Sequence, residues 1–169
     1  MGEPDWIPES VPRDRPSVAR MYDYHLGGYH NFAIDREVAD AAVAAYPDLP
    51  LVMRVNRAFL RRAVKFLIDE GVEQFLDLGS GIPTVGNVHE VAQRANPAAR
   101  VIYVDVDPVV VAHGQMILGD NPQVAVIRAD LRQSKAILQY PEARRVLDLE
   151  RPLVPCPVSL DTYGRGPLV

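Results

Sequence analysis

The stretch QFLDLGSGIPT, residues 74–84, carries the clearest fold signal in this chain. Its first half is short and apolar and runs into a glycine turn, a pattern typical of a buried β-strand. Gly79 and Gly81 let the backbone approach a ligand closely, and such a turn often lies beside a bound nucleotide. The stretch therefore predicts a strand end that binds a nucleotide-like cofactor.

Two further β-rich runs follow, at residues 99–107 and 123–130, and both end in an acidic residue. Helical stretches at residues 87–95 and 108–118 separate the runs. This alternation is the signature of a parallel sheet with crossover helices, and apolar character on both sides of each run fits strands covered on both faces. We therefore predict an α/β fold with a doubly wound parallel sheet.

Three helices are predicted ahead of the sheet, at residues 17–26, 35–46 and 51–70. The apolar residues of the third that are expected to face the core are Val52, Val55, Phe59, Ala63, Phe66 and Leu67. Its basic stripe, expected to be solvated, comprises Arg54, Arg57, Arg61 and Lys65. A short helix ahead of such a sheet can also act as a lid on the ligand, which makes Tyr24 and Asn31 candidate contacts, and Arg20 is expected to form an ion pair.

Three carboxylates follow the predicted strands in a pattern that fits one ligand. Asp77 lies beside the glycine turn, Asp105 comes where a carboxylate can accept hydrogen bonds from ribose hydroxyls, and Asp130 can accept from an adenine amino group. Asp107, followed by proline, is predicted to be a helix N-cap instead. Because Thr84 stands where a dinucleotide fingerprint has its third glycine, the pattern favours S-adenosylmethionine over NAD.

The motifs LDLGSG, VIYVDVDP and IRADL resemble the first three motifs of class I S-adenosylmethionine-dependent methyltransferases, which have a Rossmann-like fold. Residues 16–152, with SVARMYDYHLGGYHNFAIDREVA and RVNRAFLRRAVKFL, resemble an actinobacterial family of such enzymes, formerly a domain of unknown function. The resemblance implies S-adenosyl-L-methionine as cofactor and leaves the methyl acceptor, small molecule or macromolecule, unnamed. The predicted cofactor-binding residues are Asp77, Gly79, Ser80, Gly81, Asp105, Val106, Asp130, Leu131, Tyr24 and Asn31.

The amino-acid composition of the chain limits its possible binding partners and its location. A net charge of −4 argues against nucleic acid or an anionic membrane as partner, and no apolar run reaches the roughly 20 residues of a membrane span. A single cysteine, Cys156, and the absence of a signal-peptide pattern favour the cytoplasm. Four histidines without metal-ligand spacing predict no metal site.

The last residues depart from the family pattern. Residues 1–16 are expected to be a flexible arm, 17–150 a partial cofactor-binding domain and 151–169 an irregular proline-rich tail. Because Pro155 and Pro157 lack amide donors, this tail is predicted not to form the fourth strand, so that the chain would hold only the cofactor half of the fold.

Loss of the fourth strand would have consequences for function. The first strand would become an exposed edge, through which we expect self-association, and methyl transfer would be impaired. Two alternatives to a methyltransferase stay open: a non-catalytic fragment that binds S-adenosylmethionine or S-adenosylhomocysteine, and, less favoured, a NAD-type dinucleotide-binding module.

Overall fold

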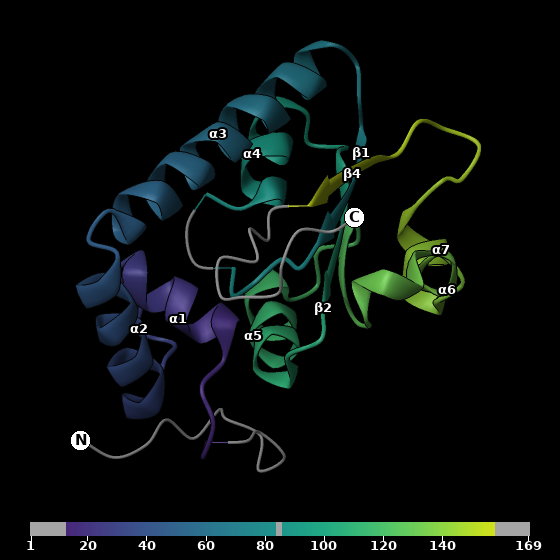
Figure 1. Ribbon diagram of the computed structural model, residues 1–169. Helices are drawn as coiled ribbons and strands as arrows, with labels where there is room; N and C mark the ends of the chain where they lie inside the picture. Colours follow the sequence, from purple (N-terminus) through teal and green to yellow (C-terminus); the bar gives the residue numbers. More distant parts are fainter. Residues whose placement is uncertain (1–12, 84–85, 158–169) are drawn as a thin grey trace.

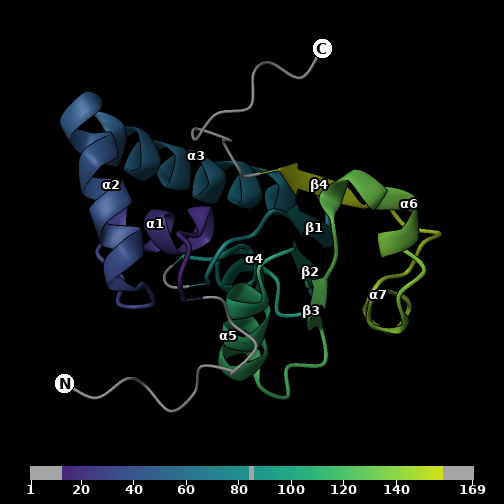
Figure 2. The ribbon, with the colours of Figure 1, turned by 60° about the horizontal axis from the view of Figure 1, so that its bottom comes forward.

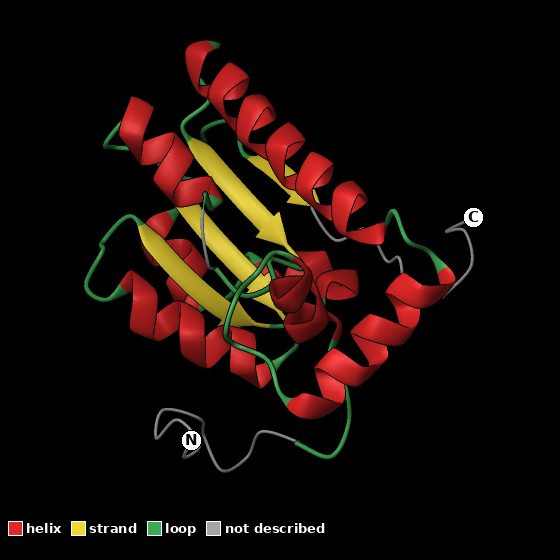
Figure 3. Ribbon diagram, turned by 90° about the vertical axis from the view of Figure 1, so that its left-hand side faces the viewer, coloured by secondary structure: helices red, strands yellow, loops and turns green. Residues whose placement is uncertain are grey.

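A computed structural model describes residues 13–83 and 86–157 of the chain. Four parallel strands form one sheet in the order β3-β2-β1-β4, and Figure 3 shows them running in the same direction. The strands are β1 Gln74–Leu78, β2 Arg100–Asp105, β3 Val124–Arg128 and β4 Val154–Pro157. The predicted α/β fold with a parallel sheet is confirmed. Residues 1–12 of the arm predicted at residues 1–16, and residues 158–169 of the predicted tail, lie outside the described residues.

Helices cover both faces of the sheet. In Figure 1, the helices α3, α4 and α5 lie on one side of the strands, and α6 and α7 lie on the other. The helices are α1 Val18–His25, α2 Ala33–Ala45, α3 Leu49–Asp69, α4 Val88–Ala95, α5 Pro108–Leu118, α6 Ser134–Ile137 and α7 Pro141–Val146, with a short 3-10 turn at Leu131–Gln133. None of the helices within the described ranges combines the length and apolar character needed to span a bilayer.

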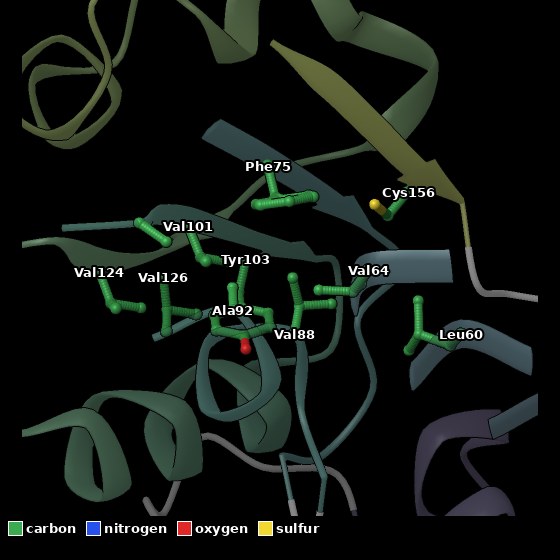
Figure 4. Packing of buried hydrophobic residues seen from close by; sticks show 11 residues of the cluster. Leu60, Val64, Phe75, Val88, Ala92, Val101, Tyr103, Val124, Val126 and Cys156 are labelled. Atoms are coloured by element: carbon green, nitrogen blue, oxygen red, sulfur yellow. The ribbon is translucent and has the colours of Figure 1, made fainter. Parts of the chain in front are cut away.

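The core has two layers because successive side chains of a strand point to opposite faces of the sheet. One layer packs under α3 and α4 and is drawn in Figure 4; it includes Leu60, Val64, Phe75, Val88, Val101, Tyr103, Val126 and Cys156. The other packs under α6 and α7 and includes Leu76, Ile102, Val104, Ile127, Ile137 and Val146. Asp77 is in register with Tyr103 and Cys156 of the neighbouring strands, so its carboxyl group belongs to the layer under α3.

The buried side of α3 differs from the prediction. The residues that pack inward are Leu49, Met53, Arg57, Leu60 and Val64, whereas Val55, Phe59 and Phe66 of the predicted core face are more than half exposed. Arg57, predicted to be solvated, is only 6% exposed. The helix is therefore rotated relative to the prediction, and it turns one guanidinium group into the protein.

β4 corrects the prediction that the sheet ends at the third strand. It pairs in parallel with β1, with Pro155 opposite Leu76 and Pro157 opposite Leu78. Neighbouring residues of a strand direct their backbone groups to opposite sides. The amides of Val154 and Cys156 can therefore pair with β1, while the amide positions of Pro155 and Pro157 face away from it. Proline is tolerated in this position on an edge strand, and within the described residues β4 is an edge of the sheet.

A buried glutamine brings the chain to that edge. The Gln74 side chain, only 1% exposed, donates from Nε2 to the Asp148 carbonyl over 2.9 Å and accepts from the Asp148 amide over 2.7 Å. Arg151 adds an ion pair with Glu73 at 2.5 Å. These contacts fix the segment between α7 and β4 beside β1, where the strand can pair.

The first two helices are held together by one buried carboxylate. Asp35, fully buried, accepts hydrogen bonds from the Ser17 amide at 2.8 Å, from Arg20 Nε at 2.7 Å and from the Phe32 amide at 2.8 Å. The ion pair predicted for Arg20 is thus confirmed as a structural one within the protein. Figure 2 shows α1 and α2 beside the first half of α3, which places α1 close to the carboxyl ends of the strands.

Candidate cofactor-binding site

A cavity of about 700 Å³ opens at the carboxyl ends of β1, β2 and β3. This is where parallel α/β sheets bind ligands, and the volume is in the range of small-molecule sites, roughly 300–1,000 Å³. Its walls are the glycine turn after β1, the segment Val104–Pro108, the segment Arg128–Arg132 and the first half of α1. Among the described residues, no cluster of histidine, cysteine and acidic side chains has the arrangement of a metal site.

The glycine turn is locked to the neighbouring strand. Gly79 and Gly81 have φ of 69° and 65°, a left-handed conformation that side chains other than glycine rarely adopt. The amides of Gly79 and Ser80 donate to the Val104 carbonyl at 2.8 and 3.2 Å. The turn is thereby fixed in a shape that leaves room for a ligand against its backbone.

Asp105 links that turn to the end of β2. One carboxylate oxygen accepts from the Gly81 amide and the other from the Asp107 amide, both at 2.9 Å. Burial raises the pKa of Asp105, and these amide hydrogen bonds counteract part of that shift. Each carboxylate oxygen has a second lone pair, so Asp105 can still accept hydrogen bonds from a ligand in the cavity.

Asp130 belongs to the segment of the cavity wall that follows β3. Its carboxylate accepts from Arg132 Nε at 2.9 Å and pairs with the same guanidinium through Nη2. The hydrogen bonds from Arg132 lower the pKa of Asp130 to about 2. A donor on a ligand would therefore share this carboxylate with an arginine, which makes Asp130 a weaker acceptor than the sequence pattern indicates.

Asp77 lies beneath the turn and does not line the cavity. Its side chain is buried, and Oδ1 has no hydrogen-bond partner. Burial raises the pKa of Asp77 to about 7, although the Arg57 charge acts in the opposite direction. A buried carboxyl group without a full set of partners, placed directly behind a ligand cavity, is a common feature of functional sites.

The cavity brings together seven of the ten residues predicted from the sequence. They are Gly79, Ser80, Gly81, Asp105, Val106, Asp130 and Leu131. Tyr24 and Asn31 contact other parts of the protein: the Tyr24 hydroxyl donates to Asp40 at 3.1 Å, and Asn31 Nδ2 donates to the buried Asp23 carboxylate at 3.1 Å.

The cavity also has a basic and aromatic wall, in which Arg57 is the residue that sequence reasoning missed. α1 contributes Arg20 and Tyr22, and Ser17 lies directly before that helix. α3 contributes Arg57, whose guanidinium lies 5.5 Å from the centre of the Tyr22 ring. α1 is fastened there because the Ser17 hydroxyl donates to Asp107. A buried arginine within an otherwise apolar helix face was the signal available in the sequence for this wall.

Asp107 caps α5, as predicted. Its Oδ1 accepts from the Val109 amide at 2.8 Å. We expect Asp107→Ala to lower the free energy of unfolding by about 1–2 kcal/mol, since the cap is lost. Asp107→Asn keeps a capping oxygen and should stay within about 0.5 kcal/mol of the wild type. Urea denaturation measures both, and an equal loss in the two variants would contradict the assignment of the cap.

The chain is similar to proteins of one family. Residues 4–161 match the sequence model of the family described as S-adenosyl methyltransferase. A crystal structure of a candidate methyltransferase from Thermobifida fusca YX is 47% identical and superposes with a TM-score of 0.85, over 90% of this chain and 57% of that one. A DUF574 family protein from Streptomyces avermitilis MA-4680 is 43% identical, with a TM-score of 0.80, over 85% of this chain and 56% of that one.

The chain thus spans little more than half the length of the two solved proteins to which it is similar. The comparison with functionally curated proteins gives no match.

Proposed function

The chain belongs to the S-adenosyl methyltransferase family, and we propose that the cavity beside its glycine turn binds S-adenosylmethionine for transfer of a methyl group to an acceptor. The observation that carries the proposal is the placement of Asp105 between the glycine turn and the cavity, where its carboxylate could accept hydrogen bonds from a ligand at the end of β2. The bound cofactor would supply an electrophilic methyl group on a positively charged sulfur.

The residues on the cavity wall fit the parts of such a cofactor. Asp105 has lone pairs left for two ribose hydroxyls, and Asp130 is available to the adenine amino group in competition with Arg132. The glycine turn leaves the backbone open, because a Cβ atom added at Gly81 would meet no atom within 4 Å. Space at this position supports close approach of a ligand to the turn.

The walls of the cavity carry both guanidinium groups and carboxylates, which suits a ligand with a cationic and an anionic part. Asp77 and Asp105 are both buried near the turn, and burial raises the pKa of each. A positive charge in the cavity would stabilise the ionised forms of both carboxyl groups. The chain's own contribution to transfer is therefore to hold the cofactor by ribose and backbone contacts, to exclude water with α1, and to align the two reactants.

Calorimetric titration of the full chain with S-adenosylhomocysteine and with NAD tests the proposal. We expect binding of S-adenosylhomocysteine, no binding of NAD, and a loss of about 1–3 kcal/mol in binding free energy for Asp105→Ala, because ribose loses a charged acceptor. Asp120→Ala removes an exposed carboxylate outside the cavity and should bind as the wild type does. Binding of NAD alone would contradict the proposal.

Methyl transfer is measured separately with S-adenosylmethionine that carries a labelled methyl group. Label that moves to a small molecule or protein of an actinobacterial lysate would support an active methyltransferase. Binding of S-adenosylhomocysteine without transfer would instead favour a non-catalytic binding protein.

A further inference from the structure

A second cavity, of about 720 Å³, lies next to the first and shares a lining residue with it. Its walls are the loop Leu26–His30 between α1 and α2, one side of α3, Pro83 after the glycine turn and Ile117 of α5. Arg57 lines both cavities. A ligand in the second cavity would therefore be a neighbour of the ligand in the first.

Three arginines of α3 line this cavity: Arg54, Arg57 and Arg61. Residues three, four and seven positions apart lie on the same side of a helix, so the three guanidinium groups are gathered along one wall. Pro83, Ala58 and Ile117 give the remaining wall an apolar character. This combination suits a molecule with an apolar body and a negatively charged group.

The guanidinium group of Arg57 is incompletely paired inside the protein. The residue is 6% exposed, and its Nε is buried without a hydrogen-bond partner. Its nearest described contacts include the face of the Tyr22 ring, 5.5 Å away, and the Asp77 carboxyl group, which interacts with it electrostatically. Leaving a buried donor of a charged group unpaired is costly, and an anionic group beside Arg57 would remove that cost.

We propose that the second cavity binds the carboxylate or phosphate of a small methyl acceptor through Arg54, Arg57 and Arg61. The proposal rests on the proposed methyltransferase function, because it assigns the second reactant to the cavity that shares Arg57 with the cofactor site. The same anion chemistry has another source, the carboxylate of the cofactor itself. The two sources differ in the residues they need, since Arg54 and Arg61 line only the second cavity.

The test is a calorimetric titration with benzoate and with inorganic phosphate, performed on the full chain with and without saturating S-adenosylhomocysteine. We expect at least one probe to bind in both conditions. The double variant with Arg54→Gln and Arg61→Gln should bind that probe with an affinity about tenfold lower, or lower still, because charge-assisted hydrogen bonds are lost. The affinity of this double variant for S-adenosylhomocysteine should equal that of the wild type.

The matched control replaces two cations of the same helix that line neither cavity, Arg62→Gln with Lys65→Gln. It removes the same net charge, so an equal loss of probe binding would show general electrostatic attraction and overturn the proposal. Competition between the probe and S-adenosylhomocysteine would also overturn it, since the anion would then bind in the cofactor cavity. The proposal is also overturned if neither probe binds at millimolar concentration.

The outcome for S-adenosylhomocysteine separates the two proposals. If the wild type binds a probe but not S-adenosylhomocysteine, the proposed function fails while the anion site itself is retained. If it binds S-adenosylhomocysteine but neither probe, only the acceptor site fails. Thermal denaturation of each variant, followed by circular dichroism, checks that the replacements leave the fold intact.

Discussion

The Asp77→Asn variant is expected to gain about 2–3 kcal/mol of stability relative to the wild type when the pH is raised from 5 to 8. Burial raises the pKa of Asp77 to about 7 in the folded protein, from an ordinary value of 3.8. Between these two values the folded protein holds a proton that the unfolded chain releases. The protonated carboxyl group thus contributes stability below the unfolded pKa, and this contribution is lost as the pH rises through about 7.

Asparagine cannot ionise, so the variant lacks this dependence on pH. Urea denaturation of both proteins at pH 5 and pH 8 gives the difference in free energy of unfolding between variant and wild type at each pH. Subtracting the two differences gives a double difference, in which the contributions of the other titrating groups cancel. Asp69→Asn is the control, because it makes the same replacement at an exposed partner of Lys65 outside the core. A double difference near zero for Asp77→Asn would show that the carboxyl group is ionised at no unusual cost.

Gly28→Ala is expected to lower the free energy of unfolding by about 3 kcal/mol, against about 1–2 kcal/mol for Gly27→Ala. A Cβ atom at Gly28 would lie 2.0 Å from Asp23 Oδ1. Asp23 is buried, and its carboxylate accepts from the His30 amide at 2.8 Å and from Asn31 at 3.1 Å. The clash would displace a buried carboxylate from its donors, which is among the larger effects of a single replacement.

The neighbouring Gly27 provides the comparison. Its φ is 81°, and a Cβ atom there would meet nothing within 4 Å, so alanine would suffer only backbone strain. Urea denaturation of the two variants and the wild type measures both losses. Equal losses would mean that Asp23 can move away cheaply, and the glycine pair would then serve only the turn. The Asp23 carboxylate thus organises the loop after Gly28, through the His30 amide and the Asn31 side chain.

The sheet and the position of the cavity at its carboxyl ends were largely predictable because they depend on local patterns. α5 spans residues 108–118 as expected, since proline after a capping aspartate marks a helix start in the sequence itself. Gly79, Gly81 and Asp105 were predictable for a similar reason, because they follow strands at fixed offsets. These features need no knowledge of which distant segments pack together.

Arg57 and β4 were missed because both depend on distant contacts. The burial of Arg57 is decided by the rotation of α3 against α1 and the sheet, and hydrophobic spacing misleads where Val55, Phe59 and Phe66 are exposed. The position of β4 is decided by the side chain of Gln74, 74 residues before its partner Asp148. The two prolines in the sequence of β4 argued against a strand.

Those two prolines also affect how two copies of this sheet could meet. A strand from another chain that aligned along β4 would find carbonyl acceptors at Pro155 and Pro157 but no amide donors. Such a pairing would forgo two ladder hydrogen bonds, roughly 1 kcal/mol each. Prolines on an edge strand are a recognised protection against uncontrolled strand addition. The residues that argue against a strand in the sequence thus make the side of β4 that faces away from β1 a poor template for aggregation.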